Sequence, residues 1–193
     1  DLHGVPFDQA ALHGFNICTP VGTKSATFRV TTTNPCTSAV AAIRQSRIRA
    51  QPVSMLMIDL DNLKLINDRH GHAAGDQALS QIVRICRQSL VGNDLLGRLG
   101  GDEFCVLLPG MDRSAAAAVA EALIETVRSS AYAFSSELKP SLSIGVATTQ
   151  SDSDDYDSLS LRADSALYAA KRSGRNRVEG VLDGETQLSL ALP

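Results

Sequence analysis

Residues 98–108, which read RLGGDEFCVLL, constrain the fold more than any other stretch of the chain. The glycines predict a tight turn between two strands, because apolar residues flank the turn on both sides. The stability of a hairpin does not require the two neighbouring negative charges of Asp102 and Glu103, because Asn or Ser would suit a solvated turn equally well. The acids therefore indicate a nearby cation, and Gly100 and Gly101 indicate that something bulky approaches the backbone.

A second predicted strand ends in a carboxylate. Residues 53–58, VSMLMI, form a continuous apolar run that is typical of a buried strand, and Asp59 follows directly. If this strand neighbours the hairpin, Asp59, Asp102 and Glu103 converge at one edge of the sheet. Like charges raise one another's pKa, so such a cluster favours a hard divalent cation such as Mg²⁺, completed by substrate phosphates. The alternative is three independent surface acids.

Strand and helix patterns intermix along the rest of the chain. Strands are predicted at 94–99, 103–108, 141–148 and around Val178, helices at 76–90, 114–127 and 159–172, and a polar loop with a short helical piece at 59–75. Before residue 50 we expect helices at 8–15 and 37–49, with a strand or hairpin within 22–35. No repeat or linker separates these patterns, so the predicted fold class is a single α+β domain.

Composition excludes several classes of protein. The 193 residues carry a net charge of −3, which leaves no basic surface for nucleic acid, and no apolar run approaches the roughly 18 residues that span a bilayer. The chain begins with Asp, which suggests a piece of a longer protein. Cys86 and Cys105 lie in apolar patterns typical of the core of the protein. Cys18 and Cys36 lie on either side of a loop-like stretch and could form a disulfide in an oxidising compartment. Nothing else indicates export, so a reducing cytoplasm is expected.

Basic residues follow at positions suited to phosphate binding. Lys64, Lys171 and Arg175 are candidates to neutralise phosphate oxygens. Lys171 and Arg175 lie around the end of a predicted helix that Gly174 stops, where basic residues also interact favourably with the helix dipole.

Two residues of the polar loop could recognise a base. The Asp76 carboxylate accepts two donors from the edge of a guanine, and Asn67 serves a complementary position, although both residue types are also common in turns and helix caps. His70 and His72 have no Cys or carboxylate partners at zinc spacing, so a structural zinc site is rejected.

Four stretches together resemble the GGDEF domains, the diguanylate cyclases that make cyclic di-GMP from GTP. They are MIDLDNLKLINDRHGHAAGDQAL, RLGGDEFCVLLP, SLSIGVAT and RADSALYAAKRSGRNRV, within residues 52–179. The resemblance implies a palm-like, ferredoxin-like fold related to class III nucleotide cyclases, with a central, mainly antiparallel sheet flanked by helices. It also implies a role in bacterial second-messenger signalling.

The resemblance further implies a role for each candidate residue. Mg²⁺, or Mn²⁺ in its place, would be bound by Asp59, the backbone carbonyl of Leu60, Asp102 and Glu103. Glu103 would also deprotonate the attacking 3′-hydroxyl, and Lys64 would stabilise the phosphates. The residues expected to bind the substrate are Asn67, His72, Asp76, Gly100, Gly101, Lys171 and Arg175. Because two GTP molecules must react with each other, a homodimer is implied, with a sensory or regulatory module preceding it.

The chain departs from the family pattern in three places. The inhibitory product site, Arg-x-x-Asp in the family, has Val91 in place of the arginine and keeps Asp94. Residues 1–8, DLHGVPFD, look like a worn opening signature, and an insertion lies near 16–37. We therefore predict a divergent part at 1–50 and a catalytic core at 51–193. The alternatives are a regulatory module that binds GTP or cyclic di-GMP without turnover, and a cyclase for mixed dinucleotides, which the retained Asp76 disfavours.

Overall fold

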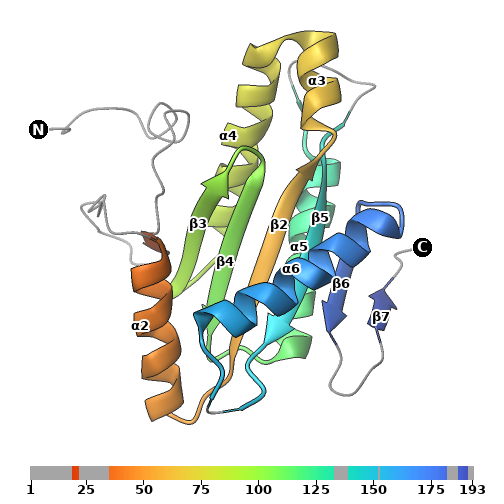
Figure 1. Ribbon diagram of the computed structural model, residues 1–193. Coiled ribbons are helices and arrows are strands. Elements are labelled where there is room, and N and C mark those ends of the chain that lie inside the picture. Colours follow the sequence, from red (N-terminus) through yellow and green to blue (C-terminus); the bar gives the residue numbers. More distant parts are fainter. Residues whose placement is uncertain (1–18, 22–34, 133–138, 152, 182–186, 191–193) are drawn as a thin grey trace, which may run out of the picture.

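A seven-stranded sheet organises the computed structural model, which describes residues 19–21, 35–132, 139–151, 153–181 and 187–190 (Figure 1). In sheet order the strands are β1 (Thr19–Val21), β3 (Asp94–Gly100), β4 (Glu103–Pro109), β2 (Val53–Asp61), β5 (Ser141–Thr148), β6 (Val178–Val181) and β7 (Gln187–Leu190). All neighbouring strands are antiparallel except β5 and β6. The predicted α+β fold with a mainly antiparallel central sheet is therefore confirmed.

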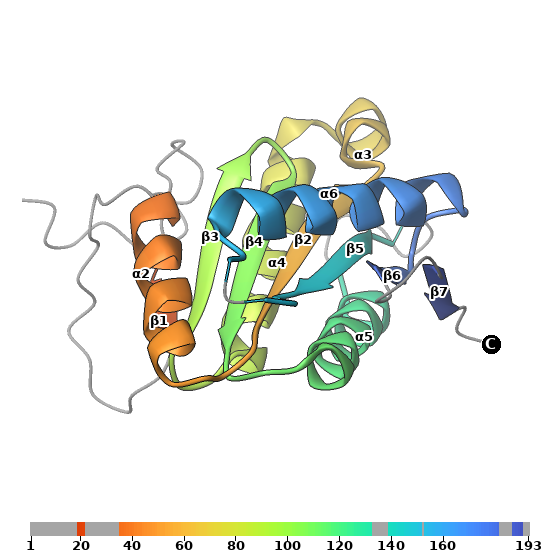
Figure 2. The ribbon, with the colours of Figure 1, turned by 60° about the horizontal axis from the view of Figure 1, so that its bottom comes forward.

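Helices cover both faces of this sheet (Figure 2). The helices of the described residues are α2 (Pro35–Ile48), α3 (Leu63–His70), α4 (His72–Ser89), α5 (Arg113–Ser129) and α6 (Tyr156–Arg172). Leu56, Ile58 and Leu60 of β2 belong to one apolar cluster with α4 and α5, whereas Met55 and Met57 belong to a second cluster with α2 and α6. Because both faces of β2 are buried, its sequence is a continuous apolar run rather than an alternating one.

Helix α4 begins at His72, four residues before the start that the sequence predicts at Asp76. Gly71, with φ 82°, separates α3 from α4, but Gly75 lies inside the helix instead of closing the loop. A Cβ at Gly75 would collide with the side chain of Asn67 and reach Leu63 at 3.0 Å. Gly75 therefore permits close packing of α3 on α4, which the sequence pattern alone did not distinguish from a turn.

The N-terminal predictions fall largely outside the described residues. The helix at 8–15, the strand or hairpin at 22–35 and the Cys18–Cys36 pair cannot be compared with the structure, which describes residues 19–21 within that region as edge strand β1. The helix predicted at 37–49 is confirmed as α2, and Cys86 and Cys105 are buried as expected. The division at residue 50 remains a prediction.

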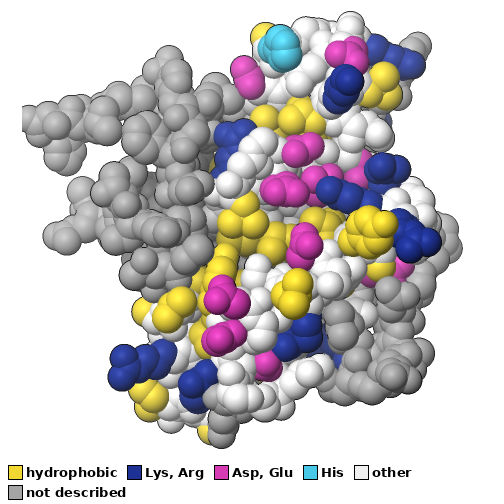
Figure 3. Space-filling model, in the orientation of Figure 1, with side chains coloured by type: hydrophobic (Ala, Val, Ile, Leu, Met, Phe, Trp, Pro, Cys, Tyr) yellow, Lys and Arg dark blue, Asp and Glu magenta, His cyan; other side chains and the backbone are white. Residues whose placement is uncertain are grey.

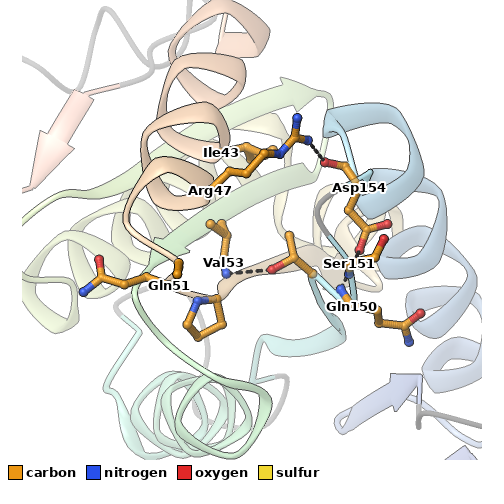
Figure 4. Close-up of a pocket in the computed structure, with 10 residues that line it drawn as sticks. Ile43, Arg47, Gln51, Val53, Gln150, Ser151 and Asp154 are labelled. Carbon is orange, nitrogen blue, oxygen red and sulfur yellow. Dashed lines mark hydrogen bonds between the residues drawn. The ribbon is translucent and has the colours of Figure 1, made fainter.

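Asp154, in the connection between β5 and α6, links three parts of the chain. Its carboxylate accepts hydrogen bonds from both terminal nitrogens of Arg162, at 2.9 and 3.0 Å, and from the backbone N–H of Gln150. Its backbone carbonyl accepts from Arg47 of α2 (Figure 4). Asp154, Gln150 and Arg47 line a cavity of about 280 Å³, which lies at the end of the sheet where β2 begins, away from Asp59. The cavity contains none of the predicted site residues.

Replacing Asp154 with Asn is expected to lower the free energy of unfolding by about 2 kcal/mol at pH 7. Burial alone would raise the pKa of Asp154, but the hydrogen bonds from Arg162 and Gln150 outweigh it and hold the pKa at about 2. A carboxyl group with a lowered pKa stabilises the fold above its ordinary pKa, and this stability is lost as the pH falls toward 2. Urea unfolding at several pH values should therefore show wild type and Asp154→Asn converging below pH 4, whereas a constant difference would contradict the assignment. Asp157→Asn, at an exposed position, is the matched control.

Candidate active site

The acids of β2 and of the β3–β4 turn are neighbours in the sheet. Asp59 lies directly opposite Glu103 in the antiparallel β2–β4 register, so the two side chains share one face. The backbone N–H of Leu60 donates to the carbonyl of Asp102 at 3.1 Å, which fixes the turn against the end of β2. The structure thus brings together Asp59, Asp102 and Glu103, on the face of the sheet that α6 covers.

The end of α6 supplies a cation to this cluster. The Lys171 Nζ lies 2.7 Å from Asp59 Oδ2, and the Asp59 side chain is only 9% exposed. Burial raises the pKa of Asp59, the hydrogen bond and charge of Lys171 lower it, and the charges of Asp102 and Asp61 raise it again, so that the net change is upward. Figure 3 shows acidic side chains gathered beside lysine and arginine side chains in the middle of this face. The arrangement therefore concentrates negative charge that an additional cation would stabilise.

Asp61 belongs to the same structure, although the sequence did not single it out. This carboxylate is 2% exposed and accepts hydrogen bonds from the hydroxyls of Ser141 and Ser143, at 2.8 and 2.7 Å. It also accepts from the backbone N–H of Asn176 at 3.1 Å, in the turn that carries Arg175. Asp61 therefore positions the segment after α6 against the sheet. The signal in the sequence is its spacing, because two residues after Asp59 a strand presents the same face.

The glycine turn is held by its neighbours and leaves room above it. Gly101 has φ 47°, which favours glycine, and its carbonyl accepts hydrogen bonds from Arg98 Nε at 3.1 Å and from Arg98 Nη2 at 2.6 Å. The guanidinium also lies over the ring of Phe104, 5.8 Å from the centroid. A Cβ at either glycine would meet nothing within 4 Å, but at Gly100 no positive φ requires glycine. The fold itself therefore does not explain a glycine at position 100.

Asn67 and Asp76 come from the two helices that cross at Gly75. Since the Asn67 side chain packs against Gly75, its amide lies beside the first turns of α4, which carry Asp76 and His72. The side chains of Asp76, His72 and Lys64 are exposed, so they remain accessible to a ligand.

Arg175 lies past the end of α6, in the turn that Asp61 positions. It has φ 64°, it is exposed, and its backbone N–H donates to the carbonyl of Ala170 at 3.0 Å. This bond reaches back five residues into the helix, as in a Schellman motif, and Gly174 supplies the positive φ before it. The turn thus holds the backbone of Arg175 near Lys171 and leaves its side chain accessible.

The donor set suits a hard divalent metal ion. Carboxylates and a backbone carbonyl offer only oxygen ligands, which Mg²⁺ prefers. Among the described residues, however, no three His, Cys, Asp or Glu side chains are grouped closely enough to hold a metal ion. The ammonium group of Lys171 contacts Asp59 instead. Metal binding therefore requires a shift of side chains, with Lys171 leaving Asp59.

Comparison with known proteins identifies the family. The family model described as "Diguanylate cyclase, GGDEF domain" matches residues 37–177. The chain belongs to the GGDEF family of diguanylate cyclases. Diguanylate cyclase A of Treponema denticola is 39% identical over 137 residues, a stretch that covers 70% of this chain and 37% of that protein. This GGDEF domain therefore spans about a third of the length of the curated relatives it matches.

Solved GGDEF domains share the fold. The active GGEEF domain of a diguanylate cyclase from Vibrio cholerae has a TM-score of 0.73 and 31% identity, covering 77% of this chain and 95% of that one. The GGDEF domain of DgcB from Caulobacter crescentus, solved in complex with c-di-GMP, has a TM-score of 0.69 and 27% identity, covering 75% and 86%. Throughout the described part of the chain, no helix has the length and apolar character to cross a membrane.

Proposed function

We propose that this GGDEF domain is an active diguanylate cyclase that condenses two GTP molecules into cyclic di-GMP with release of two pyrophosphates. The observation that carries the proposal is the pairing of Asp59 with Glu103 across adjacent strands, beside Lys171. A catalytically impaired member that only binds nucleotide would have no need of this combination. The family membership supports the reaction class.

In the proposed mechanism, the 3′-hydroxyl of one GTP attacks the α-phosphate of the other, and the reaction repeats with the roles exchanged. Glu103 accepts the proton of the attacking hydroxyl, while Lys64, Lys171 and Arg175 neutralise phosphate oxygens as pyrophosphate leaves. Bound Mg²⁺ would supply further positive charge at the phosphates through Asp59, Asp102, Glu103 and the Leu60 carbonyl.

Substrate choice in the proposal depends on the helix pair α3–α4. Asn67 and Asp76 would read the guanine edge, and His72 would line the same pocket. Because one domain holds one GTP, two domains must face each other, and a homodimer forms at least transiently. A regulatory module preceding the domain and a cytoplasmic location are parts of the same proposal.

The test is to incubate the purified chain with GTP and Mg²⁺ and to detect cyclic di-GMP and pyrophosphate by chromatography with mass detection. The specific rate is expected to rise with protein concentration over two decades, and chelation of the metal is expected to stop the reaction. GTP binding without product at any concentration would instead favour the nucleotide-binding regulatory module.

Gly100→Ala is expected to abolish cyclase activity while leaving stability within about 0.5 kcal/mol of wild type. A Cβ at this position meets no protein atom within 4 Å, so a loss of activity would reflect contact with the nucleotide phosphates. Thermal unfolding and the product assay, run on the same preparation, check both halves. Full activity in Gly100→Ala would show that the nucleotide does not approach this backbone.

Feedback inhibition through the family's product site is expected to be weak or absent. Position 91 carries an exposed valine, and the Asp94 carboxylate is buried, where it accepts a hydrogen bond from the backbone N–H of Val91 at 2.9 Å. Burial raises the pKa of Asp94 and this hydrogen bond lowers it, with a net change upward. Calorimetric titration of cyclic di-GMP into nucleotide-free protein should show no micromolar site. Micromolar binding that disappears in Asp94→Asn would contradict this expectation.

A further inference from the structure

The outer face of α6 carries side chains that the proposed active site does not use. All are exposed, and apart from the adjacent Asp164 and Ser165 they are spaced by three or four residues: Asp157, Leu161, Asp164, Ser165, Tyr168 and Arg172. This spacing places them along one side of the helix. Leu161 and Tyr168 are 69% and 62% exposed, so two large apolar side chains lie mostly in solvent on this face.

The order of these residues is symmetric about the middle of the helix. Leu161 and Tyr168 lie at equal distances from the centre between Asp164 and Ser165, and Asp157 and Arg172 lie at equal, larger distances. Figure 3 shows acidic side chains toward the Tyr156 end of α6 and basic ones toward its Arg172 end. A second α6 laid antiparallel on this face would therefore meet opposite charge at both ends, an apolar side chain at the next position inward, and the polar side chains of Asp164 and Ser165 at the centre.

We propose that the outer face of α6 binds a second copy of this chain, with the two helices antiparallel about a two-fold axis near Ser165. Such an interface is isologous, so that Leu161 contacts the partner's Tyr168 and Asp157 pairs with the partner's Arg172, and each contact occurs twice. The Arg172 guanidinium already lies over the Tyr168 ring, 5.7 Å from its centroid, which holds the charge on this face.

This pairing differs from the one that the proposed reaction needs. With a rise of 1.5 Å per residue, antiparallel helices centred near Ser165 place the two Lys171 residues about 20 Å apart along the helix axis. The outer face of α6 points away from the sheet face that carries Asp59, and both helices would lie between the two sites, so the α6 pair is a separate contact from the reactive one. One helix pair buries less than the roughly 1,200 Å² of a standard interface, and the self-association is therefore weak.

Sedimentation velocity on the nucleotide-free 193-residue chain, over a concentration series up to the millimolar range, tests the proposal. The weight-average sedimentation coefficient of wild type is expected to rise with concentration. Asp157→Arg and Arg172→Asp each place like charges opposite one another, and each should remain at the monomer value. The double variant Asp157→Arg with Arg172→Asp restores opposite charges in the same register and should associate like wild type.

The charge-swapped variant separates association from folding, because a substitution that merely damaged α6 would not be repaired by a second one. Leu161→Asp should also remain monomeric, and circular dichroism checks that each variant is folded. A wild type that stays monomeric throughout, single reversals that associate normally, or a double variant that fails to recover would each overturn the proposal. Since no nucleotide is present, these outcomes are independent of whether the chain is a cyclase.

Discussion

Glu103→Gln is expected to reduce cyclic di-GMP formation by about 10²–10⁴-fold while leaving GTP binding and stability near wild type. Glu103 is exposed and lies opposite Asp59 at the first position of β4, so no buried contact depends on its charge. Glutamine keeps the shape of the side chain but cannot accept the proton of the 3′-hydroxyl at neutral pH. The measurement is the initial rate of product formation at saturating GTP and Mg²⁺.

A matched variant distinguishes this effect from a general loss of negative charge. Glu121→Gln, on α5, changes the net charge equally and lies outside the site, so its rate should equal wild type. Equal rates for Glu103→Gln and Glu121→Gln would show that Glu103 neither accepts the proton nor assists metal binding, and the proposed mechanism would then need another base.

Gly145→Ala is expected to lower the free energy of unfolding by about 3 kcal/mol or more, a large fraction of the total stability of a domain of this size. A Cβ at Gly145 would lie within 3.0 Å of the Ala163 carbonyl and the Leu167 backbone N–H, and 2.8 Å from the Leu167 Cα. These are backbone atoms of α6, which cannot move aside as a flexible side chain does. Accommodating the methyl group requires α6 to lift from β5, and α6 carries Lys171.

Gly180→Ala is the control for this prediction. Gly180 lies on β6, beside β5 in the same sheet, and a Cβ there would be 3.7 Å from the Val146 carbonyl, an ordinary contact. Its stability should remain within about 1 kcal/mol of wild type in urea unfolding. Similar losses in the two variants would indicate that glycine matters for the strand backbone, and not for the approach of α6.

Local patterns were sufficient to predict most strands and helices of the described core. The β3–β4 hairpin and β5 appear where apolar alternation and turn glycines placed them, and Asp59 meets Glu103 because both flank strands that pair. Helix α5 begins at Arg113, one residue before its predicted start, and the side chain of the preceding Asp112 caps it by accepting from the N–H of Ala115. These features depend on neighbours in sequence or on one strand pairing.

The local sequence pattern could not predict contacts between segments that are distant in the sequence. Asp61 falls in the stretch predicted as a polar loop, yet it ends β2 and is buried against serines of β5 that lie 80 and 82 positions later. Lys171 and Asp59 are 112 positions apart, and their contact depends on the direction in which α6 crosses the sheet. Gly75 resembled a loop residue because the reason for its missing side chain is a neighbouring helix.

The placement of β2 determines how the site responds when a ligand arrives. This strand is paired on both edges and covered on both faces, so the Asp59 backbone has almost no freedom left to lose. Lys64 and Arg175, in contrast, are exposed outside the sheet and would give up side-chain freedom on binding phosphate as proposed. The Asp59 backbone is thus preorganised, whereas the two exposed cations bear the entropic cost of binding, so the tightness of guanine-nucleotide binding should depend mainly on how many phosphates are present to order them.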